Sequence, residues 1–125
     1  MRHLKKLETL NLMKNRLYEL PEAIGNVDGL KTLILDMNRL DLLPPAFQKL
    51  RRLEHFSAAM NRIHTLPESI GKLANLRYLS LEGNQLCRLP PGLGQLRLEE
   101  LRVSHNRLGE SIYLSAKKRT LVRLA

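Results

Sequence analysis

A nearly complete column of arginines recurs through the chain, at a spacing that would let guanidinium groups bind anions. Its members are Arg16, Arg39, Arg62 and Arg107, and Gln85 takes the fourth of the five places. Guanidinium groups bind carboxylates and phosphates in bidentate fashion, so this column can act as an anion-binding ladder. Alternatively, each arginine covers apolar surface with its aliphatic stem while the charged head stays in water. The sequence leaves both interpretations open.

The histidines and the single cysteine form no catalytic or metal-binding pattern. His3, His55, His64 and His105 are not accompanied by cysteines or carboxylates at the spacing of metal ligands. Cys87 has no recognisable activating motif around it. The only glycine pair that resembles a phosphate loop, Gly92-Leu93-Gly94, lacks the Gly or Lys-Ser/Thr that would follow it. The sequence therefore predicts a non-enzymatic protein without a metal or cofactor.

An asparagine precedes each place of the arginine column and sets the period of the chain. The asparagines are Asn15, Asn38, Asn61, Asn84 and Asn106, at intervals of 23, 23, 23 and 22 residues. A fixed period in this range is typical of a solenoid, in which each unit buries its apolar face against its neighbours. We predict a repeat domain over 1–109 and a basic tail over 110–125. The repeats are 7–29, 30–52, 53–75, 76–97 and a partial 98–109.

Each repeat predicts a short strand followed by a turn and a return segment. Apolar residues alternate at period two, as at Leu33 and Leu35, which indicates a strand with one buried face. The asparagine comes three residues later, where its amide can satisfy backbone groups of the neighbouring turn; left unpaired, these would cost about 1–3 kcal/mol each. A proline such as Pro44 then predicts a short helical or irregular segment on the convex side. The paired replacements Phe56 and Ala58 predict local repacking of the core.

The residues that alternate with the buried strand positions should form columns on the concave face. The columns are Thr9, Thr32, His55, Tyr78, Glu100; Asn11, Ile34, Ser57, Ser80, Arg102; Met13, Asp36, Ala59, Glu82, Ser104; and Lys14, Met37, Met60, Gly83, His105. We predict that a partner contacts a central patch in which His55 and Tyr78 act as anchors and Met37 and Met60 adapt their shape. Ordinary exposed apolar residues are the alternative.

The stretches 20–25 and 66–73, which read LPEAIG and LPESIGKL, resemble the intracellular class of 23-residue leucine-rich repeats. That class includes Ras-pathway scaffolds, Scribble-like polarity proteins and plant relatives, and the likeness extends over residues 4–108. The resemblance implies an α/β solenoid, wound as a right-handed superhelix with a concave parallel sheet. It also implies a non-enzymatic module that binds another protein on its concave face, in signalling or scaffolding.

Composition bears on partners and on location. The formal net charge is +9, from 21 Lys and Arg against 12 Asp and Glu, which favours acidic partners. Binding to nucleic acid or anionic membrane lipid is therefore an alternative function, although only 4% of the residues are aromatic and no nucleic-acid motif is present. The chain has no apolar run long enough for a transmembrane segment. A lone cysteine and the lack of Asn-x-Ser/Thr acceptors predict the cytoplasm, with the nucleus as second choice.

The two ends depart from the repeat pattern. The sequence enters a repeat at Leu4 with no cap before it, so we expect a piece or shortened variant of a longer protein, or self-association through the open edge near Leu10. In the tail, Leu114, Leu121 and Val122 recur at helical spacing. A short capping helix and plain disorder are both compatible with this segment.

Overall fold

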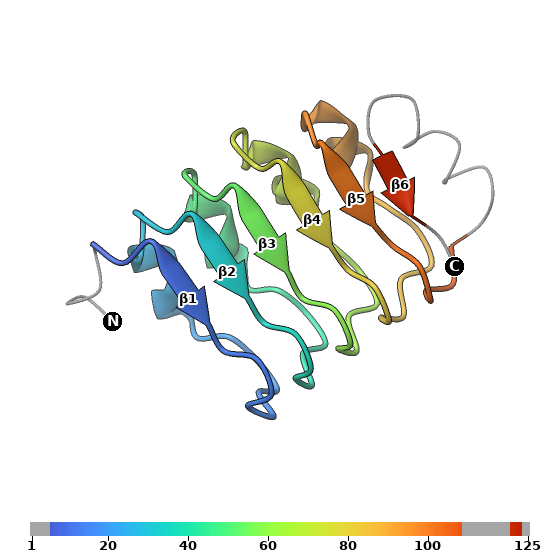
Figure 1. Ribbon diagram of the computed structural model, residues 1–125, viewed down its shortest axis with the longest axis horizontal. Coiled ribbons are helices and arrows are strands. Elements are labelled where there is room, and N and C mark those ends of the chain that lie inside the picture. The colour runs from blue at the N-terminus through green and yellow to red at the C-terminus, as the bar shows by residue number, and fades with distance from the viewer. Residues whose placement is uncertain (1–5, 109–120, 124–125) are drawn as a thin grey trace.

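Residues 6–108 and 121–123 of the chain are described by a computed structural model, and their strands form one parallel sheet. In Figure 1 the strands lie side by side in chain order, from β1 to β6. They are β1 (Thr9–Asn11), β2 (Thr32–Ile34), β3 (His55–Ser57), β4 (Tyr78–Ser80), β5 (Glu100–Arg102) and β6 (Leu121–Arg123). This arrangement confirms the solenoid with a parallel sheet that the 23-residue period predicted.

The strand register equals the sequence repeat. Thr9 pairs with Thr32, Thr32 with His55, and His55 with Tyr78. The hydrogen bonds continue beyond the three-residue strands, since Leu12 N–H donates to Ile34 O over 2.8 Å and Lys14 N–H donates to Asp36 O over 3.0 Å. Equivalent residues of successive repeats therefore lie about 4.8 Å apart, the spacing of hydrogen-bonded strands.

The chain returns through short 3₁₀ helices, which lie behind the sheet in Figure 1. They are η2 (Glu22–Asn26), η3 (Pro45–Lys49), η4 (Glu68–Lys72) and η5 (Pro91–Gln95). The predicted short helical return is thus confirmed. The recurring proline of the four full repeats is the extended residue just before the helix, as at Pro21 with φ −68° and ψ 151°. Its fixed φ and missing N–H suit this place, where no helical donor is lost.

The core is a strip of frame residues between the sheet and the helices. Leu33 and Leu35 of the second repeat are fully buried, and so are Phe56 and Ala58 of the third. The ring of Phe56 packs against Phe47 of η3, with centroids 4.7 Å apart and planes tilted by 57°. The larger Phe56 thus packs against a second aromatic ring, and the smaller Ala58 is equally buried. This agrees with the local repacking that the sequence predicted.

The asparagines join neighbouring repeats through their amides. Asn61 is buried; its Oδ1 accepts the N–H of Leu40 over 3.0 Å, and its Nδ2 donates to Leu35 O and Ala58 O over 2.9 and 3.1 Å. Asn84 repeats the pattern, and its Nδ2 also donates to Ala58 O, over 2.9 Å. Each such carbonyl therefore accepts from two successive asparagines.

This sharing makes a continuous hydrogen-bonded chain along the solenoid. It runs through Asn38, Leu35 O, Asn61, Ala58 O, Asn84, Leu81 O and Asn106. Asn15 differs, because it is exposed and its Nδ2 donates to Met13 O of its own turn. The predicted role of the asparagines is confirmed where a preceding repeat supplies the backbone groups.

Glycines of the return segments allow neighbouring 3₁₀ helices to approach closely. A Cβ on Gly71 would lie 2.5 Å from the backbone oxygen of Gly92 in η5, whereas a Cβ on Gly94 would meet nothing within 4 Å. The glycine at position 71 is therefore required by close backbone packing. Among the described glycines, a left-handed φ occurs at Gly83, where φ is 67°.

This contrast yields a paired stability prediction. Replacement of Gly71 by alanine should destabilise the fold by about 1–3 kcal/mol, because η4 and η5 must move apart. Replacement of Gly94 by alanine should be neutral or stabilise by up to about 1 kcal/mol, through reduced freedom of the unfolded chain. Urea unfolding followed by circular dichroism measures both, and equal effects of the two changes would refute close packing as the reason for Gly71.

The tail differs from the predicted helix where the structure describes it. Residues 121–123 form β6, which pairs in parallel with β5, so that Leu101 lies opposite Val122. A capping helix that includes Leu121 and Val122 is thus wrong, because the segment adds a strand to the sheet. The remainder of the predicted helix, including Leu114, lies outside the described residues.

Candidate partner-binding face

The concave columns predicted from alternation are aligned as expected. Thr32, His55, Tyr78 and Glu100 are register partners in β2 to β5 and are half-buried. In the next column Ser57 and Ser80 are buried at 6% and 4% exposure. On the concave face the larger side chains of the first column are thus more accessible than the serines of the second. These side chains are the candidates for contact with a partner.

The two predicted aromatic anchors lie against each other. The rings of His55 and Tyr78 are stacked, with centroids 4.2 Å apart and planes 21° from parallel. Such a pair adds contact area without adding many rotatable bonds, which suits an interface anchor. Partial burial lowers the pKa of His55 below its ordinary value of 6.5, and the negative charge of Asp36 partly opposes this shift. The imidazole is therefore mainly neutral at pH 7.

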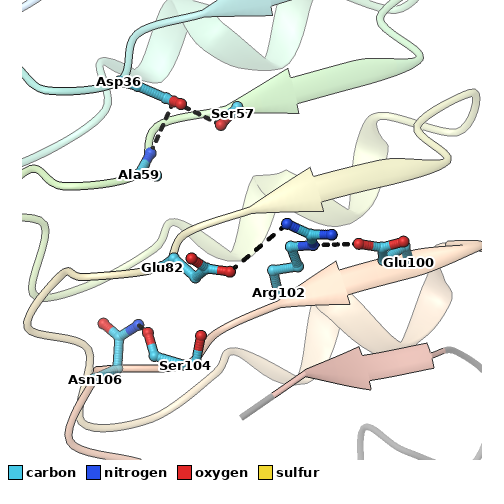
Figure 2. Close-up of polar contacts among 8 residues, drawn as sticks. All are labelled: Asp36, Ser57, Ala59, Glu82, Glu100, Arg102, Ser104 and Asn106. Carbon is cyan, nitrogen blue, oxygen red and sulfur yellow. Dashed lines mark hydrogen bonds and ion pairs between the residues drawn. The ribbon is translucent and has the colours of Figure 1, made fainter. Parts of the chain in front are cut away.

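Tyr78 also borders a group of charged side chains on β5 and the end of β4. The Arg102 guanidinium lies 6.0 Å from the centre of the Tyr78 ring. Its Nε donates to Glu100 Oε2, and its Nη1 lies 3.9 Å from Glu82 Oε1. Figure 2 shows Arg102 between these two carboxylates. One cation is thus held by two acidic groups and an aromatic face.

Asp36 is a third carboxylate on this face. Its Oδ1 accepts the hydroxyl proton of Ser57 over 2.6 Å and the N–H of Ala59 over 3.0 Å, as Figure 2 shows. These two bonds orient the carboxylate toward β3. Within the described part of the chain, no Lys, Arg or His nitrogen lies within ion-pair distance of Asp36. Its negative charge is therefore available to a ligand.

Met37 and Met60 lie beyond the ends of their strands. Met60 comes five residues after His55, and Met37 comes five residues after Thr32, the register partner of His55. Both are exposed, at 48% and 56%, and both have a left-handed backbone with φ of 59° and 57°. The predicted patch thus consists of an aromatic pair at the strands and two methionines beyond the strand ends. Asp36 directly precedes Met37 and lies between these two parts along the repeat.

The arginine column lies at the turns that follow the strands. Arg39 N–H donates to Leu17 O over 2.8 Å and Arg62 N–H donates to Leu40 O over 2.9 Å, whereas Arg16 differs in having a left-handed φ of 56°. The Arg39 guanidinium is engaged with Tyr18, donating to its hydroxyl over 2.8 Å and lying 5.6 Å from its ring centre. Among residues 6–108, none of these arginines has a carboxylate within ion-pair distance.

Sequence reasoning placed Asp36, Glu82, Glu100 and Arg102 in the concave columns but did not select them as site residues. The only sequence signal was a charged residue at a column position. The first three columns carry these three carboxylates and one guanidinium, so they are net negative although the whole chain has a formal charge of +9. These three columns are therefore acidic, in contrast to the chain as a whole.

The described residues give no structural sign of a metal site or a membrane span. Among them, no three His, Cys, Asp or Glu side chains are grouped so that they could hold a metal ion. The helices in this part of the chain are five-residue 3₁₀ turns, and none has the length or the apolar character to cross a bilayer.

Sequence comparison matches leucine rich repeat family models to residues 6–27 and 28–86, which together span more than half of the chain. No curated protein matches the sequence.

Several solved structures have the same fold. A leucine-rich-repeat protein of Leptospira interrogans is 28% identical with a TM-score of 0.80, over 98% of this chain. The chain spans only 38% of that protein's length. The ectodomain of the receptor kinase SOBIR1 from Arabidopsis thaliana is also 28% identical, with a TM-score of 0.74, and the match covers 92% of this chain and 68% of the ectodomain. Internalin C2 of Listeria monocytogenes is 19% identical with a TM-score of 0.81, covers 99% of this chain and 54% of its own, and supports the fold alone. The family-model matches, the repeats joined by asparagines and the parallel sheet agree, and the chain belongs to the leucine-rich repeat family.

Proposed function

We propose that the chain is a non-enzymatic module that binds another protein on its concave face, with His55 and Tyr78 as the anchors. The main support is the half-buried stack of these two rings. Both residues occupy variable positions of the repeat, so the scaffold itself does not need them. Leucine-rich repeats build an extended concave surface from variable positions, while the frame residues hold the scaffold. An aromatic pair on such a surface is the kind of feature that concentrates binding energy.

The proposal includes a setting inside the cell, in signalling or scaffolding, and location in the cytoplasm. Its support is the resemblance to intracellular 23-residue repeats, the lone Cys87 and the lack of glycosylation acceptors. The similar structures reported above come from bacteria and from the ectodomain of a plant receptor kinase. Localisation of a tagged chain by microscopy tests it, and export from the cell would contradict it. Self-association through the edge of β1 likewise stays a prediction.

Selection from a library of random 12-residue peptides displayed on phage tests the concave assignment. The double change His55→Ala and Tyr78→Ala should weaken binding of selected peptides at least about 10-fold, because anchor residues of this kind carry much of the binding energy. The urea midpoint should stay nearly unchanged, since neither side chain belongs to the core.

A matched control removes a tyrosine elsewhere. Tyr18 is 61% exposed and lies beside the arginine column, so Tyr18→Ala should leave peptide binding intact. Equal binding by the wild type and the double variant would reject the concave face as the docking surface.

Binding of nucleic acid or anionic lipid through the arginine column is the second candidate. The observation that favours it is the lack of carboxylate partners for Arg16, Arg62 and Arg107 among the described residues. Such binding must weaken steeply with salt, because counterion release drives it. Titration with an RNA pool and with anionic vesicles at two ionic strengths measures this dependence.

A further inference from the structure

The concave face carries charge of the sign opposite to the chain as a whole. Its first three columns hold Asp36, Glu82 and Glu100 against the single cation Arg102, while the full chain is +9. The partial burial of His55 keeps its ring mainly neutral at pH 7. A partner that lies along the sheet therefore meets a negative potential, whereas a partner at the turns meets the arginine column.

Arg102 shows how this face holds a guanidinium group. The side chain lies near the Tyr78 ring, donates to Glu100 and approaches Glu82. Carboxylate and aromatic groups together are the usual surroundings of a bound arginine, because the ring face attracts the cation while the carboxylate accepts its hydrogen bonds. Glu82 and Glu100 are thus already neutralised in part from within the chain.

Asp36 offers the same combination without an internal cation. Its carboxylate accepts from Ser57 on β3 and from Ala59 just beyond the strand, and Ser57 lies on the same face of β3 as His55, two residues away. His55, which stacks on Tyr78, is therefore close enough to Asp36 to be affected by its negative charge, and Asp36 has no cationic partner within ion-pair distance among the described residues. Exposed Met37 supplies apolar surface next to it.

We propose that the concave face recognises a basic peptide segment, and that an arginine or lysine of this segment pairs with Asp36 while its aliphatic stem lies over the His55 and Tyr78 rings. This inference rests on the proposed function and names the chemistry of the partner. The argument is charge complementarity: long basic side chains combine an apolar stem with a cationic head, which matches this surface.

The same phage selection tests the inference when the selected peptides are read for composition. Peptides that depend on His55 and Tyr78 should be rich in Arg and Lys. Asp36→Asn should weaken their binding about 5-fold, the effect of a partly exposed ion pair. The asparagine can still accept from Ser57 and Ala59, so the local backbone should be retained, and a urea melt checks this. Asp41→Asn is the matched control, because it removes the same charge from an exposed loop position outside the concave columns.

A second measurement changes the peptide instead of the protein and tests whether its arginine and Asp36 are coupled. Replacing each arginine of a selected peptide by neutral citrulline should identify one position whose loss weakens wild-type binding about 5-fold but leaves binding to Asp36→Asn unchanged.

The outcomes separate the two proposals. Peptides that need Tyr78 but are acidic or neutral, or that ignore Asp36→Asn, would overturn this inference and leave concave docking intact. Peptides that bind equally to the His55→Ala and Tyr78→Ala double variant would overturn both. Acidic peptides that are lost on Arg62→Ala would instead assign recognition to the arginine column.

Discussion

Replacement of Asn61 by alanine is expected to lower the free energy of unfolding by about 2–4 kcal/mol. Asn61 is buried, and the change removes its bonds to Leu40 N–H, Leu35 O and Ala58 O. The two carbonyls keep a second donor from the asparagines of neighbouring repeats, Asn38 and Asn84. The buried Leu40 N–H loses its partner, so its desolvation makes up much of the cost. Urea denaturation followed by far-UV circular dichroism measures the change.

Two further variants test whether the cross-repeat bonds are the cause. Asn15→Ala should cost less than about 0.5 kcal/mol, because Asn15 is exposed and its side-chain amide donates to Met13 O of its own turn. Asn61→Asp should also destabilise, since a carboxylate can accept from Leu40 N–H but cannot donate to the two carbonyls. Equal stability of Asn61→Ala and Asn15→Ala would contradict the account of a hydrogen-bonded chain through the repeats.

Replacement of Phe56 by alanine is expected to cost about 3–5 kcal/mol. The side chain is fully buried and packs on Phe47, so its removal leaves a cavity between β3 and η3 that neighbouring repeats cannot readily fill. The same urea experiment measures the loss. Leu42→Ala is the control, because Leu42 is 53% exposed, and it should change stability by no more than about 0.5 kcal/mol. A small effect of Phe56→Ala would contradict the close packing of Phe56 in the core of the third repeat.

The repeat frame could be predicted from the sequence because the same residue type occupies the same structural role in each repeat. Leu33 and Leu35 mark a strand with a buried face, and Asn38 marks the amide that joins two turns; the register of the sheet follows from their spacing. The local repacking in the third repeat could also be predicted, because Phe56 is larger and Ala58 is smaller than the leucines at the same places of neighbouring repeats.

For side chains that do not repeat, the sequence predicts the position in the sheet but not the contacts that the side chain makes. The columns placed Asp36 and Arg102 on the concave face, but the bonds of Asp36 to Ser57 and of Arg102 to Glu100 depend on rotamers that no periodicity encodes. The role of Gly71 was missed for a similar reason, because the close approach of Gly92 comes from the next repeat. β6 was missed because Leu121 and Val122 fit helical spacing and lack the repeat frame.

The central claim is that frame residues build the solenoid while the concave columns bind the partner. Amide NMR spectra recorded during titration with a phage-selected peptide test it most directly. The account predicts the largest shift changes at 32–37, 55–60 and 78–82, with the convex residues 68–72 of η4 nearly unchanged. Largest changes in the convex helices, or at the turn residues that carry the arginine column, would contradict it.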